Sequence, residues 1–398
     1  MSAKSSSRPD VVICSAVRTP IGSFQGALSP LSAADLGGVV VDEAVKRAGA
    51  KRADVERVIL GNVLPAGMGQ APARQAVIKA GLPVGVGAIT INKVCGSGLQ
   101  AMMFARREIA FGDVEVMIAG GMESMTNAPY CLPKARSGYR MGNGEIVDTM
   151  IHDGLWDPYD NMHMGNCGDM VAAKYGFTRA DQDAFATASY QRAQAAQKEG
   201  RFKEEIVPVT VKDRKGETLV DEDEEPKRIQ LDKMASLRAA FSKEGTVTAA
   251  NASTLNDGAA ALLLASADVA KARGYQVLAK IVVDSTAAVE PKWFTIAPVH
   301  ALAKLYEKSG TKPLDWDLYE INEAFSGVTM AAMKDHGIPH DRVNVHGGAV
   351  SLGHPIGCSG ARVVVTLINA LRQRNGKRGI ATLCIGGGEA VAMGVELV

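Results

Sequence analysis

The chain has no closely spaced cysteine pair, no long apolar run and almost no net charge. Six cysteines are scattered along it: Cys14, Cys95, Cys131, Cys167, Cys358 and Cys384. Without a Cys-x-x-Cys pair, neither a zinc ribbon nor a thioredoxin-type dithiol is indicated. A long chain with dispersed cysteines is typical of a reduced, intracellular protein. His163 and Cys167 stand four residues apart, but no second half of a metal site accompanies them, so we expect no bound metal.

The formal net charge of +1 gives no electrostatic case for a nucleic-acid partner. No apolar stretch is long enough to cross a membrane without a glycine or charge interruption. The N-terminal residues enter a strand-like run by Val11 with no long apolar segment before it, which argues against a secretory signal. We therefore expect a cytoplasmic protein that binds neither nucleic acid nor membranes.

What the chain does contain is an alternation of strand-like and helix-like segments. With 398 residues, 46% hydrophobic and 22% charged, it has the composition of a soluble globular protein of two or three domains. Residues 10–17 and 55–64 are strand-like, and residues 32–49 have helical spacing. This pattern predicts α/β layers, with helices covering a sheet. The pattern does not give strand direction, so a mixed sheet is compatible with it.

Two distant stretches, residues 95–121 and 358–388, resemble each other. Each begins with cysteine and small residues, continues as a helix-like run, passes a glycine turn, and ends in a strand and a glycine cluster. Val364, Leu367, Ile368 and Leu371 show the helical spacing clearly. The similarity predicts two related halves. The alternative is the general likeness of all βα units.

Between these stretches, residues 125–249 are rich in Met, Gly, Asp and charge. We interpret them as a loop-rich insertion that covers one face of the sheet and helps to build a pocket. The acidic run at residues 220–228 is interpreted as a solvated loop. An amphipathic helix is expected near residues 178–200, with Thr178 as its cap and Asp181 in its first turn.

Several chemically capable residues stand at glycine turns or strand ends. Cys95 is either a small buried residue in a tight corner or a nucleophile whose thiolate the following helix start stabilises. Pro355 keeps His354 out of the helical region, so its imidazole is presented from a loop. Cys384 ends a strand-like run, and Asn322 follows another.

Taken singly, His354 and Cys384 are better explained as structural residues. Taken together, two thiols, a histidine and an asparagine are what an acyl-transferring enzyme uses. A base activates one thiol, a second thiol shuttles a proton, and backbone N–H groups of glycine turns bind an oxyanion. Ligand sites of α/β sheets also tend to lie beyond strand ends. The combination predicts catalysis.

Seven motifs, in order along nearly the whole chain, resemble those of the thiolases. They are "NKVCGSGLQA", "GGMESM", "HMG", "GTVTAANASTLNDGAAA", "NEAF", "GGAVSLGHPIGCSGAR" and "LCIGGGEAVAM". The resemblance implies a five-layered α-β-α-β-α fold of two duplicated halves with an inserted loop domain. The corresponding division is 1–124 plus 250–275 for the first half, 125–249 for the loop domain, and 276–398 for the second half.

By the same resemblance, Cys95 is the nucleophile that accepts the acyl group and His354 takes its proton. Cys384 moves a proton between solvent, the substrate α-carbon and the departing thiol. Asn322 holds a water that, with His354, binds the thioester oxygen of the enolate. Backbone N–H groups of Cys95 and Gly386 bind the oxyanion at the acyl-cysteine.

The resemblance also implies coenzyme A and acetyl-CoA as substrates, with no permanently bound cofactor. Lys227 and Arg228 are expected near the nucleotide phosphates or adenine. The remaining expected contacts follow the pantetheine arm, although core packing is the alternative for the apolar ones: His163, Met164, Leu237, Phe241, Ala249, Ser253, Ala324 and Phe325.

Among thiolases, "HMG" and "LCIGGGEAVAM" are similar to the biosynthetic, acetoacetyl-CoA type. His346 and "WFTIAPVHAL" look like the mitochondrial type, some of which bind potassium through a tyrosine in the acidic loop. Pro226 stands there in this chain, so a potassium site is doubtful. Bulky Trp293 and Phe294 in the loop that closes on the acyl group favour acetyl over long chains.

The sequence therefore predicts a reversible Claisen condensation of two acetyl-CoA to acetoacetyl-CoA plus CoA. The alternative within the family is a degradative 3-ketoacyl-CoA thiolase of broader chain length. A ketoacyl-synthase-like enzyme would lack Cys384, and a silent acyl-CoA carrier would not need the four polar residues together. The resemblance further implies a homodimer built on the sheets, often paired into a tetramer through the loop domain.

Overall fold

The computed structural model describes residues 9–213 and 216–398. One ten-stranded mixed sheet runs through the molecule in the order β14-β15-β16-β13-β1-β12-β5-β3-β4, with β2 beside β12. Its strands are β1 (Val11–Arg18), β2 (Gly22–Ser23), β3 (Arg57–Gly61), β4 (Gly87–Ile91), β5 (Val116–Ser124), β12 (Asn256–Ser266), β13 (Ala279–Ala288), β14 (Leu318–Ile321), β15 (Arg378–Ile385) and β16 (Glu389–Leu397).

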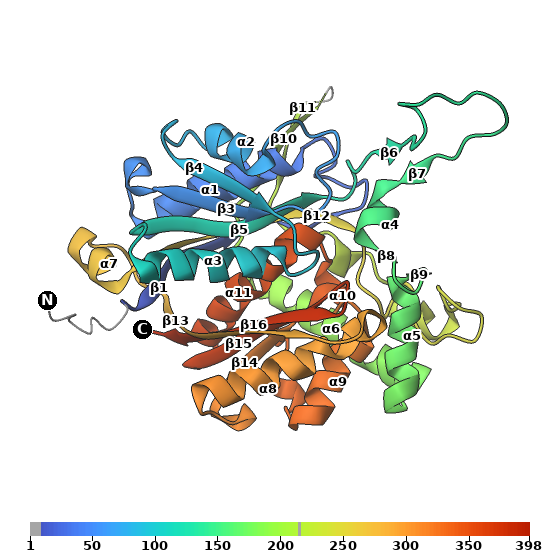
Figure 1. Ribbon diagram of the computed structural model, residues 1–398. Helices are drawn as coiled ribbons and strands as arrows, with labels where there is room; N and C mark the ends of the chain where they lie inside the picture. The colour runs from blue at the N-terminus through green and yellow to red at the C-terminus, as the bar shows by residue number, and fades with distance from the viewer. Residues whose placement is uncertain (1–8, 214–215) are drawn as a thin grey trace, which may run out of the picture.

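Helices divide this sheet into two layers and cover both (Figure 1). They are α1 (Ala33–Ala48), α2 (Pro72–Lys79), α3 (Ser97–Phe111), α7 (Ala267–Arg273), α8 (Ala297–Ser309), α9 (Ser326–His336), α10 (Ala349–Leu352) and α11 (Ile356–Gln373). Helices α1 and α2 cover the first strand layer, α3 and α11 lie between the layers, and α8 and α9 cover the second. The expected five-layered α-β-α-β-α fold is confirmed.

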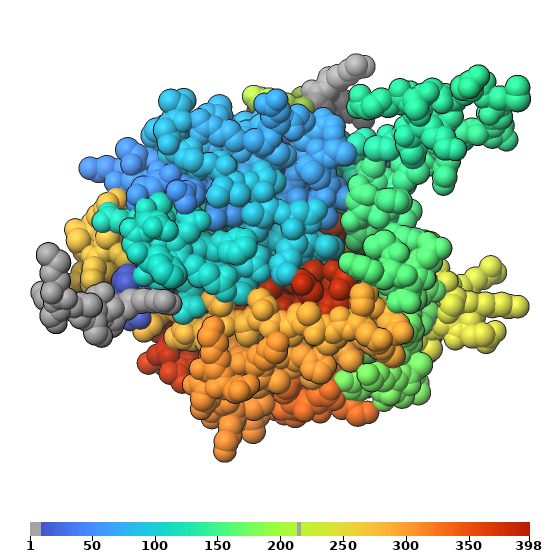
Figure 2. Space-filling view, in the orientation of Figure 1, coloured from blue at the N-terminus to red at the C-terminus, as the bar shows by residue number. Residues whose placement is uncertain are grey.

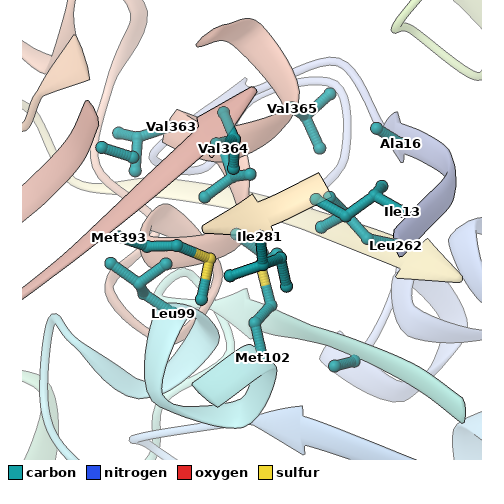
Figure 3. Packing of buried hydrophobic residues seen from close by; sticks show 14 of the residues in the cluster. Ile13, Ala16, Leu99, Met102, Leu262, Ile281, Val363, Val364, Val365 and Met393 are labelled. Atoms are coloured by element: carbon teal, nitrogen blue, oxygen red, sulfur yellow. The ribbon is translucent and has the colours of Figure 1, made fainter. Parts of the chain in front are cut away.

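Helix α11 is buried along most of its length in the central layer. Every residue from Ile356 to Leu371 is buried, because the helix is enclosed by strands and by α3. Figure 3 shows side chains of both strand layers meeting those of the central helices, among them Leu99, Met102 and Val364. This apolar core fixes the distance between the two halves.

The two halves repeat one pattern of strand pairing. In the first, β3 pairs parallel with β5, β5 antiparallel with β12, and β12 antiparallel with β1. In the second, β14 likewise pairs parallel with β15, β15 antiparallel with β16, and β16 antiparallel with β13. Two residue pairs between β1 and β13, Val12 with Lys280 and Ile13 with Ala279, join the layers. The predicted duplication is confirmed.

One detail of the predicted repeat is wrong, namely the match of Cys95 with Cys358. In the first half, β4 pairs parallel with β3 and is followed by the bridge Lys93–Cys95. In the second half, Val343 pairs parallel with Tyr319 of β14 and is followed by the bridge Val345–Gly347. Gly347 therefore occupies the position of Cys95. Cys358 is the third residue of α11 and is 1% exposed. The cysteines aligned only because each stands close to the start of a helix in the central layer.

The segment between β5 and β12 crosses one end of the layers, and its β6–β7 portion projects from the body (Figures 1 and 2). Its elements are β6 (Tyr130–Cys131), β7 (Val147–Asp148), α4 (Thr149–Gly154), β8 (Trp156–Asp157), β9 (Met162–His163), α5 (Met164–Tyr175), α6 (Arg179–Lys198), β10 (Val209–Asp213) and β11 (Gly216–Val220). Thr178 caps α6 in a capping box with Asp181, as predicted. The three-part division of the chain stays a prediction.

The acidic run at residues 220–228 is not the solvated loop that its charge suggested. Asp223 is 1% exposed and binds the buried Arg18 guanidinium through two oxygens, at 2.6 and 2.9 Å. Glu224 accepts hydrogen bonds from the backbone N–H groups of Ser23 and Ala27. The interpretation was wrong because the partners lie some two hundred residues away. Only Asp221 and Glu222 of its acids are exposed.

Across residues 9–213 and 216–398, no helix combines the length and apolar character that a membrane span requires.

Candidate active site

Cys95 stands on a strained turn between β4 and α3. The preceding residue, Val94, has a φ of 45°, which is unusual for a β-branched side chain. Hydrogen bonds hold the turn: the Ser97 hydroxyl donates to the Val94 carbonyl at 2.7 Å and accepts from the Lys93 N–H at 2.8 Å. Strain of this kind persists only where surrounding structure imposes it. The turn places Cys95, a half-buried residue, at the corner.

The turn lies against the end of β15 in the second half. A Cβ atom on Gly96 would stand 2.3 Å from the Cδ1 atom of Ile385, so only glycine permits this approach. The Cys95 sulfur accepts a hydrogen bond from the Gly386 backbone N–H and interacts electrostatically with the Cys384 thiol. The structure thus brings together Cys95, Cys384 and Gly386 from the two halves.

Both sulfurs are protonated at neutral pH. Burial raises the pKa of the Cys95 thiol to about 11, while the N–H groups of Gly386 and of Cys95 itself act to lower that pKa. Burial raises the pKa of Cys384 far above its usual value, and the neighbouring Cys95 raises it further. A thiolate stabilised by the helix start alone is therefore not what the structure shows. Cys95 needs a base to become nucleophilic.

His354 has the protonation state of such a base. Its Nδ1 atom is 2.6 Å from the Ser359 hydroxyl, which itself donates to the Pro355 carbonyl at 2.9 Å. Because the hydroxyl proton is donated to that carbonyl, the hydroxyl oxygen can only accept a hydrogen bond from the ring. The ring proton is therefore on Nδ1, and Nε2 keeps its lone pair. Burial, aided by the charge of Arg362, lowers the pKa of His354 to about 3. The imidazole is neutral at physiological pH.

Asn322, directly after β14, lies beside this lone pair. Its Nδ2 atom is 3.5 Å from His354 Nε2, and its side chain is fully buried. Among the residues that the structure describes, none pairs with Asn322 Oδ1. Leaving a buried amide oxygen without a hydrogen bond costs about 1–3 kcal/mol of stability. Asn322 is therefore placed to hold a polar group close to His354.

A cavity of about 560 Å³ opens in front of His354. Seven of the ten residues expected to contact coenzyme A line it: His163, Met164, Arg228, Phe241, Ala249, Ser253 and Phe325. The His163 ring stacks on Phe241 with 4.6 Å between centroids. The cavity is mainly apolar, which suits a flexible arm, and its lining includes one guanidinium, Arg228, and one carboxylate, Glu225.

The other three expected contacts lie outside this lining. Lys227 is exposed and forms an ion pair with Glu222. Leu237 is 36% exposed, and Ala324 is buried, with its carbonyl accepting the Ser253 N–H at 3.0 Å.

The lining also omits Cys95, but Met164 connects the cavity to the thiols. A Cβ atom placed on Gly386 would lie 3.6 Å from the Met164 sulfur, so this cavity residue packs against the glycine that donates to Cys95. The thiols therefore lie directly behind the wall of the cavity.

Glu123 is a buried acid at the site that the sequence reading did not single out. Its carboxylate accepts hydrogen bonds from Asn62 Nδ2 at 2.6 Å and from the N–H groups of Val63 and Gly357, each at 2.9 Å. Burial raises its pKa to about 7, and its charge raises the pKa of Cys95. Glu123 thus joins the end of β5 to the start of α11.

Sequence reasoning also missed Ser359 and Asn256, whose Oδ1 atom accepts the His354 N–H at 2.9 Å. Both belong to quoted motifs, but only Ser359 is near His354 in the sequence, and no local pattern indicated the contact with Asn256. Of the additional apolar lining, Met125, Leu255 and Ile356 stand in quoted motifs, and no sequence signal marked the others: Phe24, Met150, Ile151 and Leu155.

Comparison with known proteins identifies the family. The sequence matches the thiolase N-terminal domain over residues 11–268 and the thiolase C-terminal domain over residues 275–397. The chain belongs to the thiolase family. This thiolase is 52% identical to acetyl-CoA acetyltransferase of Pseudomonas aeruginosa, over 96% of this chain and 98% of that protein. It is 51% identical to acetyl-CoA acetyltransferase of Cupriavidus necator, over 97% and 99%.

Solved structures agree with the fold of this thiolase. The crystal structure of acetyl-CoA acetyltransferase from Bacillus anthracis superposes with a TM-score of 0.97 at 44% identity, covering 99% of this chain and 100% of that one. A thiolase from Ascaris suum, solved in complex with coenzyme A, gives a TM-score of 0.93 at 44% identity, covering 98% and 100%.

Proposed function

We propose that this thiolase catalyses the reversible Claisen condensation of two acetyl-CoA to acetoacetyl-CoA plus CoA. The observation that carries the proposal is the meeting of Cys95, hydrogen-bonded to Gly386, with Cys384 beside a cavity that contains neutral His354. The names of relatives about half identical in sequence favour acetyl-CoA over longer 3-ketoacyl substrates.

The first half-reaction acetylates Cys95. His354 Nε2 takes the Cys95 proton, and the sulfur attacks the thioester carbonyl of acetyl-CoA. Negative charge develops on the carbonyl oxygen, where the N–H groups of Cys95 and Gly386 donate hydrogen bonds. CoA leaves with a proton from Cys384, so the products are acetyl-Cys95, a Cys384 thiolate and protonated His354.

The second half-reaction forms the carbon–carbon bond. The Cys384 thiolate removes an α-proton from a second acetyl-CoA, and the enolate oxygen is held by His354 Nε2–H and a water bound to Asn322. The enolate carbon attacks the acetyl-Cys95 carbonyl, and the Cys95 thiolate departs and recovers the proton from His354. Atoms and charges then match the resting enzyme.

For coenzyme A, we propose that Arg228 meets the phosphate end and that His163, Phe241 and Phe325 flank the pantetheine arm. These residues line the cavity in front of His354. The guanidinium suits a phosphate because its donors match two oxygens at once. Lys227 would join them only after release from Glu222.

The decisive experiment mixes the enzyme with acetyl-CoA and measures intact mass and condensation rate. We expect one acetyl group on Cys95 in the wild type and none in Cys95→Ser. The same preparation should cleave acetoacetyl-CoA faster than a long-chain 3-ketoacyl-CoA. Undiminished acetylation of the Cys95→Ser variant would remove the proposed nucleophile, and preference for the long chain would favour the degradative alternative.

We also propose a homo-oligomer. Strand β4 forms one edge of the sheet and leaves several side chains partly exposed, and the β6–β7 segment projects from the body (Figure 2). An exposed edge strand is a ready pairing surface. Light scattering of the purified full chain distinguishes monomer, dimer and tetramer, and a monomer at micromolar concentration would contradict the proposal.

A further inference from the structure

A second cavity, of about 590 Å³, lies where the end of α6, the end of α11 and the loop at residues 345–346 meet. None of its lining residues lines the cavity in front of His354. Its polar side chains are Arg192, Glu199, Arg201, His346, Gln373 and Arg374. The function proposed above leaves this group of residues without a role.

The lining carries three guanidinium groups and one carboxylate. Arg201 Nε pairs with Glu199 at 2.6 Å. Arg192 donates instead to the backbone carbonyl of Val343 at 2.8 Å, and its pKa is lowered mainly by burial and further by the charge of Arg374. Positive charge therefore exceeds negative charge in the lining by two.

The third guanidinium is also bonded to the backbone. Arg374 Nη1 donates to the Asp341 carbonyl at 3.4 Å, a long and weak contact. Three further acids act on Arg192 by their charge, but none is part of the lining: Glu323, Asp341 and Glu320. Arg374 is exposed, so its donors can turn into the cavity at little cost.

Uncharged polar atoms without partners accompany these cations. His346 is 3% exposed, and neither of its ring nitrogens has a hydrogen-bond partner among the described residues. Burial, together with the charges of Arg201 and Arg374, lowers the pKa of His346 to about 4, so the ring is neutral. The Gln373 amide donates to the Arg201 carbonyl at 2.7 Å, while its Oε1 atom is unpaired in the same described part of the chain.

We propose that this second cavity binds a small phosphate monoester. Guanidinium groups donate to phosphate oxygens in pairs, and an excess of two positive charges matches a phosphate dianion. A neutral histidine supplies one further N–H donor, and Gln373 Oε1 accepts from a hydroxyl of the ligand. The volume exceeds that of inorganic phosphate, so the cavity has room for the organic part of the ester too.

Because the two cavities share no residue, binding here should not compete with coenzyme A. The test is calorimetric titration of the full-length enzyme, saturated with CoA, using glycerol phosphate as the probe. We expect one site in the wild type. Arg201→Gln combined with Arg374→Gln should weaken binding roughly a hundredfold, since each lost charge-assisted hydrogen bond is worth about tenfold or more.

The matched control removes two exposed lysines from other helices, Lys271→Gln on α7 and Lys304→Gln on α8. It changes net charge equally and should bind glycerol phosphate like the wild type. The single variant Arg374→Gln, at an exposed position, should still lose about tenfold. Absence of glycerol phosphate binding, equal weakening in the control, or displacement by CoA would each overturn the proposal.

Discussion

The Nδ1 atom of His354 lies 2.6 Å from the hydroxyl oxygen of Ser359, within the first turn and a half of α11. Because that hydroxyl is already committed to the Pro355 carbonyl, it can only accept from the ring. The direction of the imidazole lone pair is thus set by the start of a helix. The base is oriented before any substrate arrives.

Ser359→Ala should impair catalysis without impairing binding. The change frees the ring to place its proton on Nε2, which removes the lone pair proposed to take the Cys95 proton. We expect kcat to fall roughly 10- to 100-fold, which is part of the roughly 10²–10⁴-fold acceleration that a general base usually contributes. KM for acetyl-CoA should change little. Steady-state condensation kinetics give both values, and Ser309→Ala, at the end of α8, is the control. An unchanged kcat would show that Ser359 does not select the tautomer.

Cys384→Ala should separate the two half-reactions. In the proposed mechanism the second thiol removes the α-proton, so condensation should fall by roughly 10²–10⁴-fold. Exchange of acetyl groups between CoA and Cys95 should fall much less. Radiolabel exchange and condensation are measured on the same preparation, with Cys131→Ala on exposed β6 as the control. Equal loss of both activities would refute this division of labour.

Glu123→Gln should make Cys95 easier to ionise. The buried carboxylate raises the pKa of the Cys95 thiol, and its own pKa is about 7, so it is charged mainly above that pH. Above pH 7 the variant should react with iodoacetamide roughly two to five times faster than wild type, the size expected of one nearby charge. Below pH 7 the two rates should converge.

The control for this change is Glu244→Gln, which removes an exposed carboxylate. Its alkylation rate should follow that of the wild type across the pH range. A uniform acceleration of the Glu123→Gln protein at every pH would indicate a loosened turn rather than a lost charge.

Arg18→Met should destabilise the fold severely. Arg18 is fully buried between Glu205 and Asp223, each at 2.6 Å, and its removal leaves two buried carboxylates without a cation. We expect a loss of about 3–5 kcal/mol in the free energy of unfolding. Lys46→Met breaks only exposed ion pairs, with Asp42 and Glu43, and should cost less than about 1 kcal/mol. Urea unfolding of both variants measures the difference, and similar midpoints would contradict the argument.

Local patterns predicted those parts of the fold whose causes are local. The alternation of segments, the paired α3–β5 and α11–β15 units, and the Thr178 cap all depend on residues within a turn or two. His354 was placed on a loop for the equally local reason that Pro355 follows it.

Other features could not be predicted, because their partners are remote in sequence. Nothing near Asp223 indicates that Arg18 lies against it. Met150 and Leu255 give no sign that they share a cavity. The match of Cys95 with Cys358 failed because a four-residue helix, α10, had been added in one half only.

Cys95 is also synthesised long before His354 and Cys384. Cys95 belongs to an early strand and helix, whereas His354 and Cys384 arrive with the last elements, α11 and β15. A nascent chain therefore carries a protonated, unassisted sulfur throughout most of its synthesis. If the proposed roles hold, reactivity toward acyl thioesters requires α11 and β15 as well as Cys95, so a translation product that ends before α11 should not react with acetyl-CoA.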